Sequence, residues 1–216
     1  MERQYTPREK IANWLHYHVW HLVAAAFVII VLIGVLRNKA ALNRDGYDYY
    51  FAYVGAAAIE EDNVRLLENA LASLGADVNG DGAVTVRLNQ FISGNDVTNE
   101  DAVYGNAAGV AMLADITEGE SYFFLLEDPE TFQLEFQLLA LPDGSPSAED
   151  DFGAWDKVCS WKDCPALTGL QAQLGKDADF LALLDRLYLG RRCFVNPDMA
   201  SNSPENAELW HILTDQ

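Results

Sequence analysis

The sequence lacks the motifs that identify several common enzyme classes. It contains no GxSxG nucleophile motif, no glycine-rich phosphate-binding loop and no HExxH zinc motif. Nothing in it therefore indicates the hydrolases, P-loop proteins or zinc proteases that carry these motifs. Basic side chains are also scarce, with 14 Lys and Arg against 33 Asp and Glu. A pI near 4.3 excludes nucleic acid as a partner, because both molecules would be negatively charged.

Histidine is nearly absent from most of the chain. Three of the four histidines lie within residues 13–21, NWLHYHVWH, and the fourth is His211. His18 and His21 are three residues apart and would share a helical face, as metal or haem ligands do. Trp, Tyr and His also suit the lipid headgroup layer, because each has an apolar body and a polar tip. We favour this interfacial belt, which leaves His211 as the histidine candidate for acid–base chemistry.

Charge is missing altogether from one long run. Residues 11–36 hold no charged side chain, and residues 22–36 hold nothing more polar than glycine. About 20 apolar residues in a helix cross the hydrocarbon of a bilayer. We therefore predict a transmembrane signal anchor at residues 13–37, which binds the lipid bilayer. A cytoplasmic tail at 1–12 would precede it, and a linker at 38–46 would follow it.

A cleaved signal peptide is the alternative to this anchor. Such peptides have a shorter apolar core, which is followed by small residues at the cleavage site. Ala40 and Ala41 could form that site. The segment Arg37 to Lys39 resembles a membrane exit instead, so we favour retention of the anchor.

The orientation in the membrane does not follow from the flanking charges, which are balanced on the two sides of the run. Residues 46–216, however, carry 8 Lys and Arg against 30 Asp and Glu, and they hold all three cysteines. Long acidic domains are exported largely regardless of charge. We predict a single-pass protein of the cell membrane with an extracytoplasmic domain.

The three cysteines leave their redox state open. Cys159 and Cys164 are close enough in sequence for a small disulfide loop, which would leave Cys193 unpaired. Three free thiols are an alternative. Zinc binding is disfavoured because no CxxC and no nearby histidine accompany the cysteines.

After the linker, the local patterns alternate between strand and helix. Aromatic content and side-chain alternation predict strands at residues 47–54, 83–91 and 121–126. Apolar residues at helical spacing and an alanine-rich apolar run predict helices at 60–74 and 101–117. The order β-α-β-α-β is typical of a mostly parallel sheet with covering helices.

The second half of the chain is less regular. Residues 132–141 favour a strand or a short helix, and 142–151 have the composition of a surface loop. Helices are predicted at 177–189 and, begun by Ser203, at 204–213. No element is assigned between residues 152 and 175. The fold class is therefore α/β, with the transmembrane helix followed, at residues 47–216, by a compact three-layer domain with a small mostly parallel sheet.

Three segments carry a resemblance that extends over residues 13–132. They are YDYYFAYVG, LENALASLGADVNGDGAVTV and GESYFFLLEDPETF, and they follow the aromatic and histidine-rich NWLHYHVWH. The chain resembles poorly characterised single-span proteins of Gram-positive bacteria that have a short extracytoplasmic α/β domain. The strand and helix order also resembles one lobe of type II periplasmic solute-binding proteins. About 170 residues cannot supply the two lobes that enclose a ligand in that family.

One motif carries ion chemistry. Residues 77–88, DVNGDGAVTVRL, resemble the calcium loops of dockerins and EF-hands, in which oxygen ligands recur at loop positions 1, 3 and 5 and glycine stands at position 6. The resemblance implies a calcium site whose ligands are Asp77, Asn79, Asp81, the carbonyl of Ala83, and Thr85.

Two features leave the assignment of a calcium site undecided. Position 12 is Leu88, where the family has a bidentate acid; Asp96, Glu100 or Asp101 would have to replace it. Asn, Asp and Gly are also the residues expected of a simple turn between a helix and a strand. A calcium loop and a plain turn are therefore both compatible with NGDG.

Acidic residues provide weaker candidate sites. Glu127 and Asp128 follow a predicted strand, and the carboxyl ends of strands are where α/β proteins bind ligands. The sequence EDPE is also an ordinary turn, which we favour. Four other acids could pair for acid–base chemistry, although unpaired surface carboxylates are expected in so acidic a chain: Asp48, Asp150, Asp151 and Asp156.

These observations favour a non-enzymatic, membrane-tethered binding or interaction module of unknown ligand, with calcium as a candidate stabilising ion. One alternative is a reduced solute-binding domain that works with a transporter or as a dimer, and another is an extracytoplasmic hydrolase. A binding module predicts an apolar groove with a polar rim near Gly55 and Glu127. A hydrolase predicts two facing acids with raised pKa values at the same place.

Overall fold

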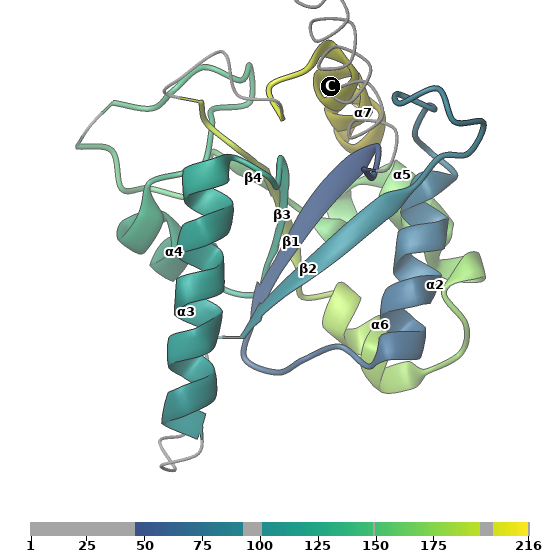
Figure 1. Ribbon diagram of the computed structural model, residues 1–216, viewed down its shortest axis with the longest axis horizontal. Helices are drawn as coiled ribbons and strands as arrows, with labels where there is room; N and C mark the ends of the chain where they lie inside the picture. The colour runs from purple at the N-terminus through teal and green to yellow at the C-terminus, as the bar shows by residue number, and fades with distance from the viewer. Residues whose placement is uncertain (1–45, 93–100, 149, 195–200, 216) are drawn as a thin grey trace, which may run out of the picture. The chain divides into compact units, whose positions relative to one another are not determined.

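The computed structural model in Figure 1 describes residues 46–92, 101–148, 150–194 and 201–215. Side chains are not described for residues 101–108. The predicted anchor at 13–37 lies outside the described residues, as do Asp96 and Glu100, so these predictions stay untested. Within the described ranges, no helix is both long and apolar enough to cross a membrane. The fold is that of residues 47–216, which form a unit separate from residues 1–46.

A five-stranded sheet forms the centre of this unit, with the strand order β2-β1-β3-β5-β4. Its strands are β1 (Tyr49–Gly55), β2 (Val86–Ile92), β3 (Phe123–Leu126), β4 (Val158–Ser160) and β5 (Tyr188–Arg191). β1 pairs in parallel with β2 and with β3, whereas β5 is antiparallel to both β3 and β4. The α/β class is confirmed. The prediction of a mostly parallel sheet is wrong, because two of the four pairings are antiparallel.

Helices cover both faces of the sheet (Figure 1). One face carries α2 (Glu61–Ala72), α5 (Pro165–Gly169), α6 (Ala178–Leu184) and α7 (Pro204–Thr214), with the 3-10 turns η1 (Trp161–Asp163) and η2 (Leu170–Gln173). The other face carries α3 (Asp101–Glu118) and α4 (Pro129–Phe136). Successive strand residues point to opposite faces. Phe51 and Tyr53 of β1 therefore enter the larger core with α2, whereas Ala52 enters the smaller core with α3 and α4.

The two parallel crossovers place the chain on opposite faces. α2 connects β1 to β2 on one side of the sheet, and α3 connects β2 to β3 on the other. β1 and β3 are neighbours, yet the chain leaves β1 toward α2 and leaves β3 toward α4. A crevice forms at the carboxyl ends of two such strands, and α/β proteins commonly bind ligands there.

The second half of the domain departs from the sequence-based prediction. The helix expected at 177–189 ends at Leu184, because residues 188–191 form β5 between β3 and β4. Leu187 and Leu189 are fully buried, so the apolar run continues into the sheet rather than along a helix. Residues 152–175, to which no element was assigned, contain β4, η1, α5 and η2.

Helix ends follow the local chemistry. Ser203 caps α7 as predicted, since its hydroxyl accepts a hydrogen bond from Asn206 N at 3.2 Å. The C-terminal cap of α2 is Ser73, two residues before Gly75. A Cβ at Gly75 would lie 2.4 Å from the Tyr49 ring, so glycine is required there for close packing.

Candidate functional site

A cavity of about 480 Å³ lies at the carboxyl ends of β1, β2 and β3. Most of its lining is apolar: Val54, Phe91, Ile92, Met112, Phe132 and Phe136. Its polar side chains are Glu127, Asp128, Thr131 and Glu135. The cavity has the position and the character of the groove that the sequence predicts near Gly55 and Glu127.

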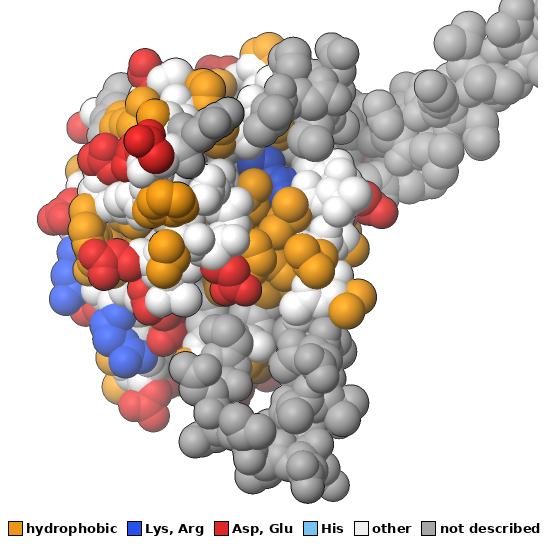
Figure 2. Space-filling view, turned by 90° about the vertical axis from the view of Figure 1, so that its left-hand side faces the viewer, with side chains coloured by type: hydrophobic (Ala, Val, Ile, Leu, Met, Phe, Trp, Pro, Cys, Tyr) orange, Lys and Arg blue, Asp and Glu red, His pale blue; other side chains and the backbone are white. Residues whose placement is uncertain are grey.

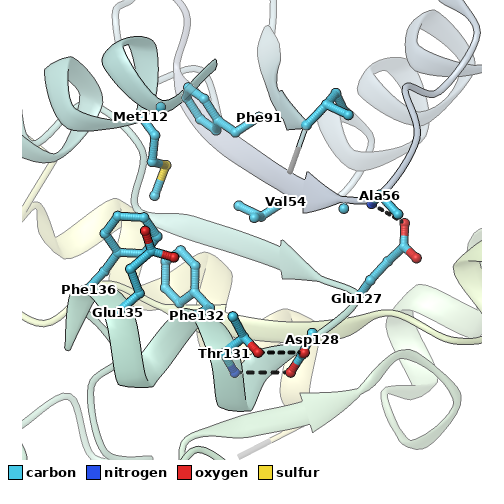
Figure 3. A pocket seen from close by; sticks show the side chains of 13 residues that line it. Val54, Ala56, Phe91, Met112, Glu127, Asp128, Thr131, Phe132, Glu135 and Phe136 are labelled. Carbon is cyan, nitrogen blue, oxygen red and sulfur yellow. Dashed lines mark hydrogen bonds between the residues drawn. The ribbon is translucent and has the colours of Figure 1, made fainter. Parts of the chain in front are cut away.

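Four elements position this lining. Val54 and Phe91 stand near the ends of β1 and β2 and point to the face that carries α3 and α4, from which Met112 and Phe132 meet them. Figure 3 shows Met112, Phe132 and Phe136 at one end of the cavity, with Glu135 beside Phe136, and Glu127 at the other end, beside Ala56. Figure 2 views the same side of the domain and shows hydrophobic and acidic side chains mixed over it.

Glu127 is held in place by two hydrogen bonds. Its Oε1 accepts from the Tyr53 hydroxyl at 2.5 Å and from Ala56 N at 3.3 Å. The same hydroxyl lies 2.9 Å from the Ala57 carbonyl oxygen, so one proton is shared by two acceptors. Burial of Tyr53, and then its hydrogen bond to Glu127, raise the pKa of Tyr53 above its usual range. The phenol therefore stays neutral and acts as the donor.

Gly55 makes this contact sterically feasible. A Cβ at residue 55 would lie 2.3 Å from both Glu127 Oε1 and the Tyr53 hydroxyl oxygen. Any larger residue would have to displace one of the two side chains. The glycine that ends β1 therefore leaves the space in which a strand-end carboxylate and a buried tyrosine meet.

Asp128 has a structural role, as the turn interpretation predicts. Its carboxylate accepts hydrogen bonds from Thr131 N at 3.0 Å and from the Thr131 hydroxyl at 2.7 Å, which caps the start of α4. These hydrogen bonds lower the pKa of Asp128 below its usual value. The two acids at the start of EDPE thus differ in role: Asp128 caps α4, whereas Glu127 lines the cavity.

A second cavity of about 450 Å³ lies on the other side of Glu127. Ala56 and Glu127 line both cavities. The second one is more polar and includes Asp177, Asp179 and Arg186. Its Asp177 caps α6 and accepts a hydrogen bond from Asn63, so part of its polar lining is already engaged in holding the fold.

The predicted calcium loop forms a hydrogen-bonded turn. Asp77 Oδ1 accepts from Gly80 N at 2.7 Å and from Asp81 N at 3.2 Å, and its Oδ2 accepts from Gly82 N at 2.9 Å. Asn79 Oδ1 accepts from Asp81 N at 2.9 Å. Gly80 and Gly82 have φ values of 73° and 95°, in the left-handed region that only glycine adopts without strain. Three of the five predicted ligands therefore belong to one tight loop.

The predicted ligand Thr85 is already engaged with another residue. The Thr85 hydroxyl and Thr85 N both donate to Asp48 Oδ2, at 2.9 and 2.7 Å. Leu88, at the position of the missing acid, is buried in β2. Among the described side chains, no group of three His, Cys, Asp or Glu is arranged to hold a metal.

Asp48 fastens this loop to the sheet. Its Oδ1 accepts from Val78 N and Asn79 N, at 2.8 and 2.9 Å, and its Oδ2 binds Thr85. Burial alone would raise the pKa of Asp48, but the combined hydrogen bonds outweigh burial and lower it. The sequence marks Asp48 only as one of many acids. Its partners are 30 to 37 residues away, so no local signal reveals this role.

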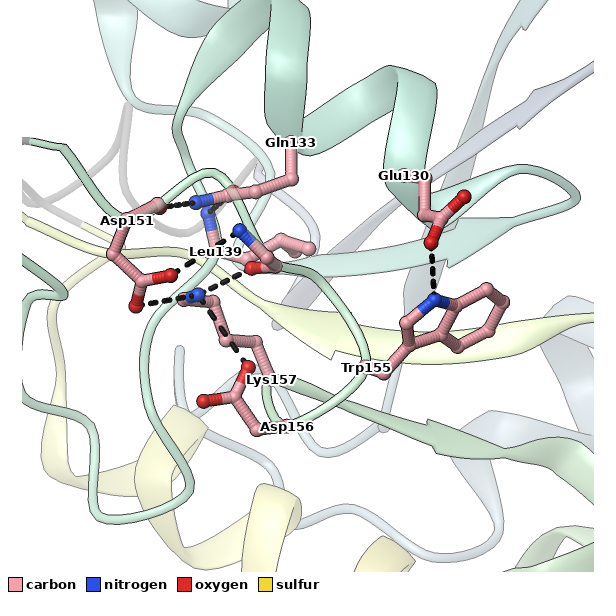
Figure 4. A network of polar contacts seen from close by, with 8 residues as sticks. Glu130, Gln133, Leu139, Asp151, Trp155, Asp156 and Lys157 are labelled. Atoms are coloured by element: carbon pink, nitrogen blue, oxygen red, sulfur yellow. Dashed lines mark hydrogen bonds and ion pairs between the residues drawn. The ribbon is translucent and has the colours of Figure 1, made fainter.

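Asp151 and Asp156 pair with a buried lysine rather than with each other (Figure 4). The Lys157 side chain is fully buried, and its Nζ lies 2.9 Å from Asp151 Oδ2 and 3.5 Å from Asp156 Oδ1. It also donates to the Gly153 carbonyl. The hydrogen bond from Lys157 lowers the pKa of Asp151. This network lines neither cavity. It joins residues 151, 153, 156 and 157 to one another and so stabilises the loop before β4.

The structure brings two of the three cysteines together. Cys159 Sγ and Cys164 Sγ are 2.7 Å apart, and both are free thiols. Burial, and then the neighbouring Cys159, raise the pKa of the Cys164 thiol. Cys193 is also free. His211, in α7, lines neither of the two cavities described above.

Comparisons with known proteins do not assign the chain to a family. No family model matches the chain, and no curated protein or solved structure matches it either. The resemblances to single-span proteins, solute-binding lobes and calcium loops therefore stay predictions. The chain's function has to be inferred from the geometry of its own residues.

Proposed function

We propose that residues 47–216 are a non-enzymatic binding module whose ligand occupies the cavity beside Glu127. In this proposal, residues 13–37 tether the module to the cell membrane, and the domain faces the extracytoplasmic side. The observation that carries the proposal is the mostly apolar cavity at the carboxyl ends of β1, β2 and β3, with one carboxylate fixed by Tyr53 and Ala56. Apolar cavities of this size with a few placed polar groups are typical ligand sites.

The same geometry favours binding over hydrolysis. An acid pair for hydrolysis needs two facing carboxyl groups with raised pKa values. Asp128, the acid next to Glu127, instead has a lowered pKa, because Thr131 donates two hydrogen bonds to it. Its oxygens are engaged in capping α4, so it is poorly suited to exchange a proton with a ligand.

Filling the cavity tests this proposal. Gly109 lines the cavity from α3, and a Cβ there would meet no atom within 4 Å. Gly109→Phe should therefore occupy the cavity without a backbone clash. Gly169→Phe is a matched control, because Gly169 is also helical with open space around its Cβ but lines neither cavity.

The measurement is a small-molecule fragment screen by NMR on the full chain, labelled with ¹³C-methyl methionine and held in lipid nanodiscs. Met112 lines the cavity and is one of three methionines, and its signal is assigned with Met112→Leu. We expect fragments that shift the Met112 signal in the unaltered chain and in Gly169→Phe, but not in Gly109→Phe. A screen in which no fragment shifts Met112 would contradict the proposal.

A reduced solute-binding domain that dimerises or contacts a transporter is the second candidate. α3 exposes Val110 and Leu113 to 68% and 57% next to the cavity-lining Met112. They are three residues apart and share a helical face, and neighbouring exposed apolar side chains can mark an interaction site. A partner that covered them would also enlarge the cavity wall. We expect Val110→Ser with Leu113→Ser to dissociate such an assembly in sedimentation velocity; a chain that is monomeric before substitution would rule out the dimer.

A further inference from the structure

We infer that the ligand is a small organic cation: an amine or guanidinium group on an apolar body. This inference rests on the proposed function, because it assigns a chemical class to the ligand of the same cavity. It follows from the charges of the lining, from the unused bonding capacity of Glu127, and from the aromatic cluster that lines the cavity away from Glu127.

The charges of the cavity lining have one sign. Glu127, Asp128 and Glu135 line it, and no Lys, Arg or His is among its described lining residues. An anionic ligand would therefore meet three carboxylates without a compensating base. Like charges repel one another more strongly in a partly buried cavity than in water, so this cavity selects against anions.

Glu127 has one oxygen fixed and one available. Oε1 accepts the hydrogen bonds from Tyr53 and Ala56, whereas Oε2 accepts none from the described residues. Asp128 differs, since each of its oxygens accepts from Thr131. Glu127 is half-buried and lines both cavities. A preorganised carboxylate with an open acceptor is suited to bind an N–H donor that carries positive charge.

The far end of the cavity suits an apolar body. Phe132 packs against Phe124 and Phe136, with ring centroids 4.9 and 5.3 Å apart. Met112 lies beside this aromatic cluster, at the opposite end of the cavity from Glu127, and the Glu135 carboxylate lies beside Phe136 at the same end (Figure 3). A ligand with a cationic head at Glu127 and an apolar tail at Phe132 would meet both ends. A cavity of about 480 Å³ is the size of a site for one small molecule.

Three probes of similar size separate the charge of the ligand from its apolar character. They are 2-phenylethylamine, the uncharged 2-phenylethanol and the anionic 3-phenylpropanoate. Each is titrated into the full chain in nanodiscs of neutral phosphatidylcholine, and the ¹³C-methyl signal of Met112 reports occupancy of the cavity. The probe comparison needs no substitution, so it decides the question even if a variant does not fold.

Glu127→Gln adds a residue-level arm. Gln keeps an oxygen that can accept from Tyr53 and Ala56 but removes the charge. Glu118→Gln is the matched control, because Glu118 is an exposed acid at the end of α3 that lines neither cavity. Both variants change the net charge equally, so a general electrostatic effect would appear in both.

We expect the amine to bind at least tenfold more tightly than the alcohol in the unaltered chain and in Glu118→Gln, and this preference to be lost in Glu127→Gln. Equal affinities for amine and alcohol, or tightest binding of the propanoate, would overturn the cationic class and leave the proposed binding function intact. If no probe shifts Met112 at millimolar concentration and the fragment screen also fails, both proposals are wrong.

Discussion

At the residue scale, Gly55 controls the geometry of the candidate site. Tyr53 and Glu127 are 74 residues apart in the chain, and they meet over a glycine that has no Cβ to separate them. The carboxylate is positioned by this steric allowance and by the two hydrogen bonds it receives. A substitution at residue 55 therefore probes the site without replacing either polar side chain.

Gly55→Ala should destabilise the fold and displace Glu127. Its Cβ would lie 2.3 Å from two oxygen atoms, and overpacking of this kind costs about 1–3 kcal/mol. Urea denaturation measures the loss. Gly109→Ala is the control, because its Cβ meets nothing within 4 Å and alanine favours a helix. Equal stability of the two variants would contradict the close contact at residue 55.

The thiols of Cys159 and Cys164 should form a disulfide on oxidation. Their sulfur atoms are already neighbours, and glutathione disulfide can accept the two electrons and two protons that the thiols lose. We expect a Cys193→Ser chain treated with this oxidant to resist alkylation until it is reduced, as measured by intact mass. A bond that closes so short a loop stabilises by about 2 kcal/mol. Alkylation of both thiols after oxidation would contradict the prediction.

At the scale of elements, a buried ion pair connects α3 to the segment after β5. Asp115 Oδ1 lies 3.3 Å from an Arg192 guanidinium nitrogen, and both side chains are 2% exposed. Arg192 also donates to the Asp115 carbonyl, and Ser121 donates to the Asp115 carboxylate. Desolvation lowers the pKa of Arg192, and the charge of Asp115 opposes that effect. The pair fixes α3, one wall of the cavity, to the sheet.

Asp115→Ala should be strongly destabilising. It leaves the Arg192 charge buried without its partner, and such losses cost about 3–5 kcal/mol. Glu118→Ala, an exposed acid in the same helix, should change stability by less than about 0.5 kcal/mol. Denaturation midpoints of the two variants make the comparison. Similar midpoints would show that the buried pair does not hold α3 in place.

The loop between α2 and β2 carries two separable expectations. Asp77→Ala should lower stability by about 1 kcal/mol even in EDTA, because three backbone N–H groups lose their acceptor. The calcium prediction adds that millimolar calcium raises the melting temperature of the unaltered chain by several degrees, and that Asp77→Ala abolishes this rise. Identical melting in calcium and in EDTA would leave the loop as a turn.

At the scale of the whole molecule, charge is the dominant feature. Residues 46–216 carry 30 acidic and 8 basic residues, and three of the latter, Lys157, Arg191 and Arg192, are buried. Like charges on the surface repel one another and oppose compact packing. The same field would attract cations to the cavity beside Glu127, so stability and recognition depend on the same charge distribution.

Salt should therefore stabilise this domain. Between about 0.01 M and about 1 M NaCl the Debye length falls from about 30 Å to about 3 Å, which screens the repulsion among surface carboxylates. We expect the melting temperature, followed by near-ultraviolet circular dichroism, to rise by about 2–4 °C for each kcal/mol gained. A fall with added salt would mean that attractive ion pairs outweigh the repulsion.

Sequence patterns predict the first half of the fold well. β1, α2, β2, α3 and β3 lie within a few residues of the predicted ranges, because periodicity and capping are properties of neighbouring residues. The sequence patterns do not predict β5, because its four residues follow an apolar helical run. Only pairing with β3 and β4 makes them a strand. The same antiparallel pairing of β5 makes the sheet mixed rather than mostly parallel.

The candidate site divides in the same way. The position of Glu127 after a strand, and the glycine that ends β1, are visible in the sequence and determine which edge of the sheet holds the site. Only the tertiary structure decides three contacts. Tyr53 is the partner of Glu127, Asp48 anchors the loop at Asp77, and Lys157 pairs with Asp151. Local patterns reflect interactions between residues close in the chain, whereas these contacts join residues that only folding brings together.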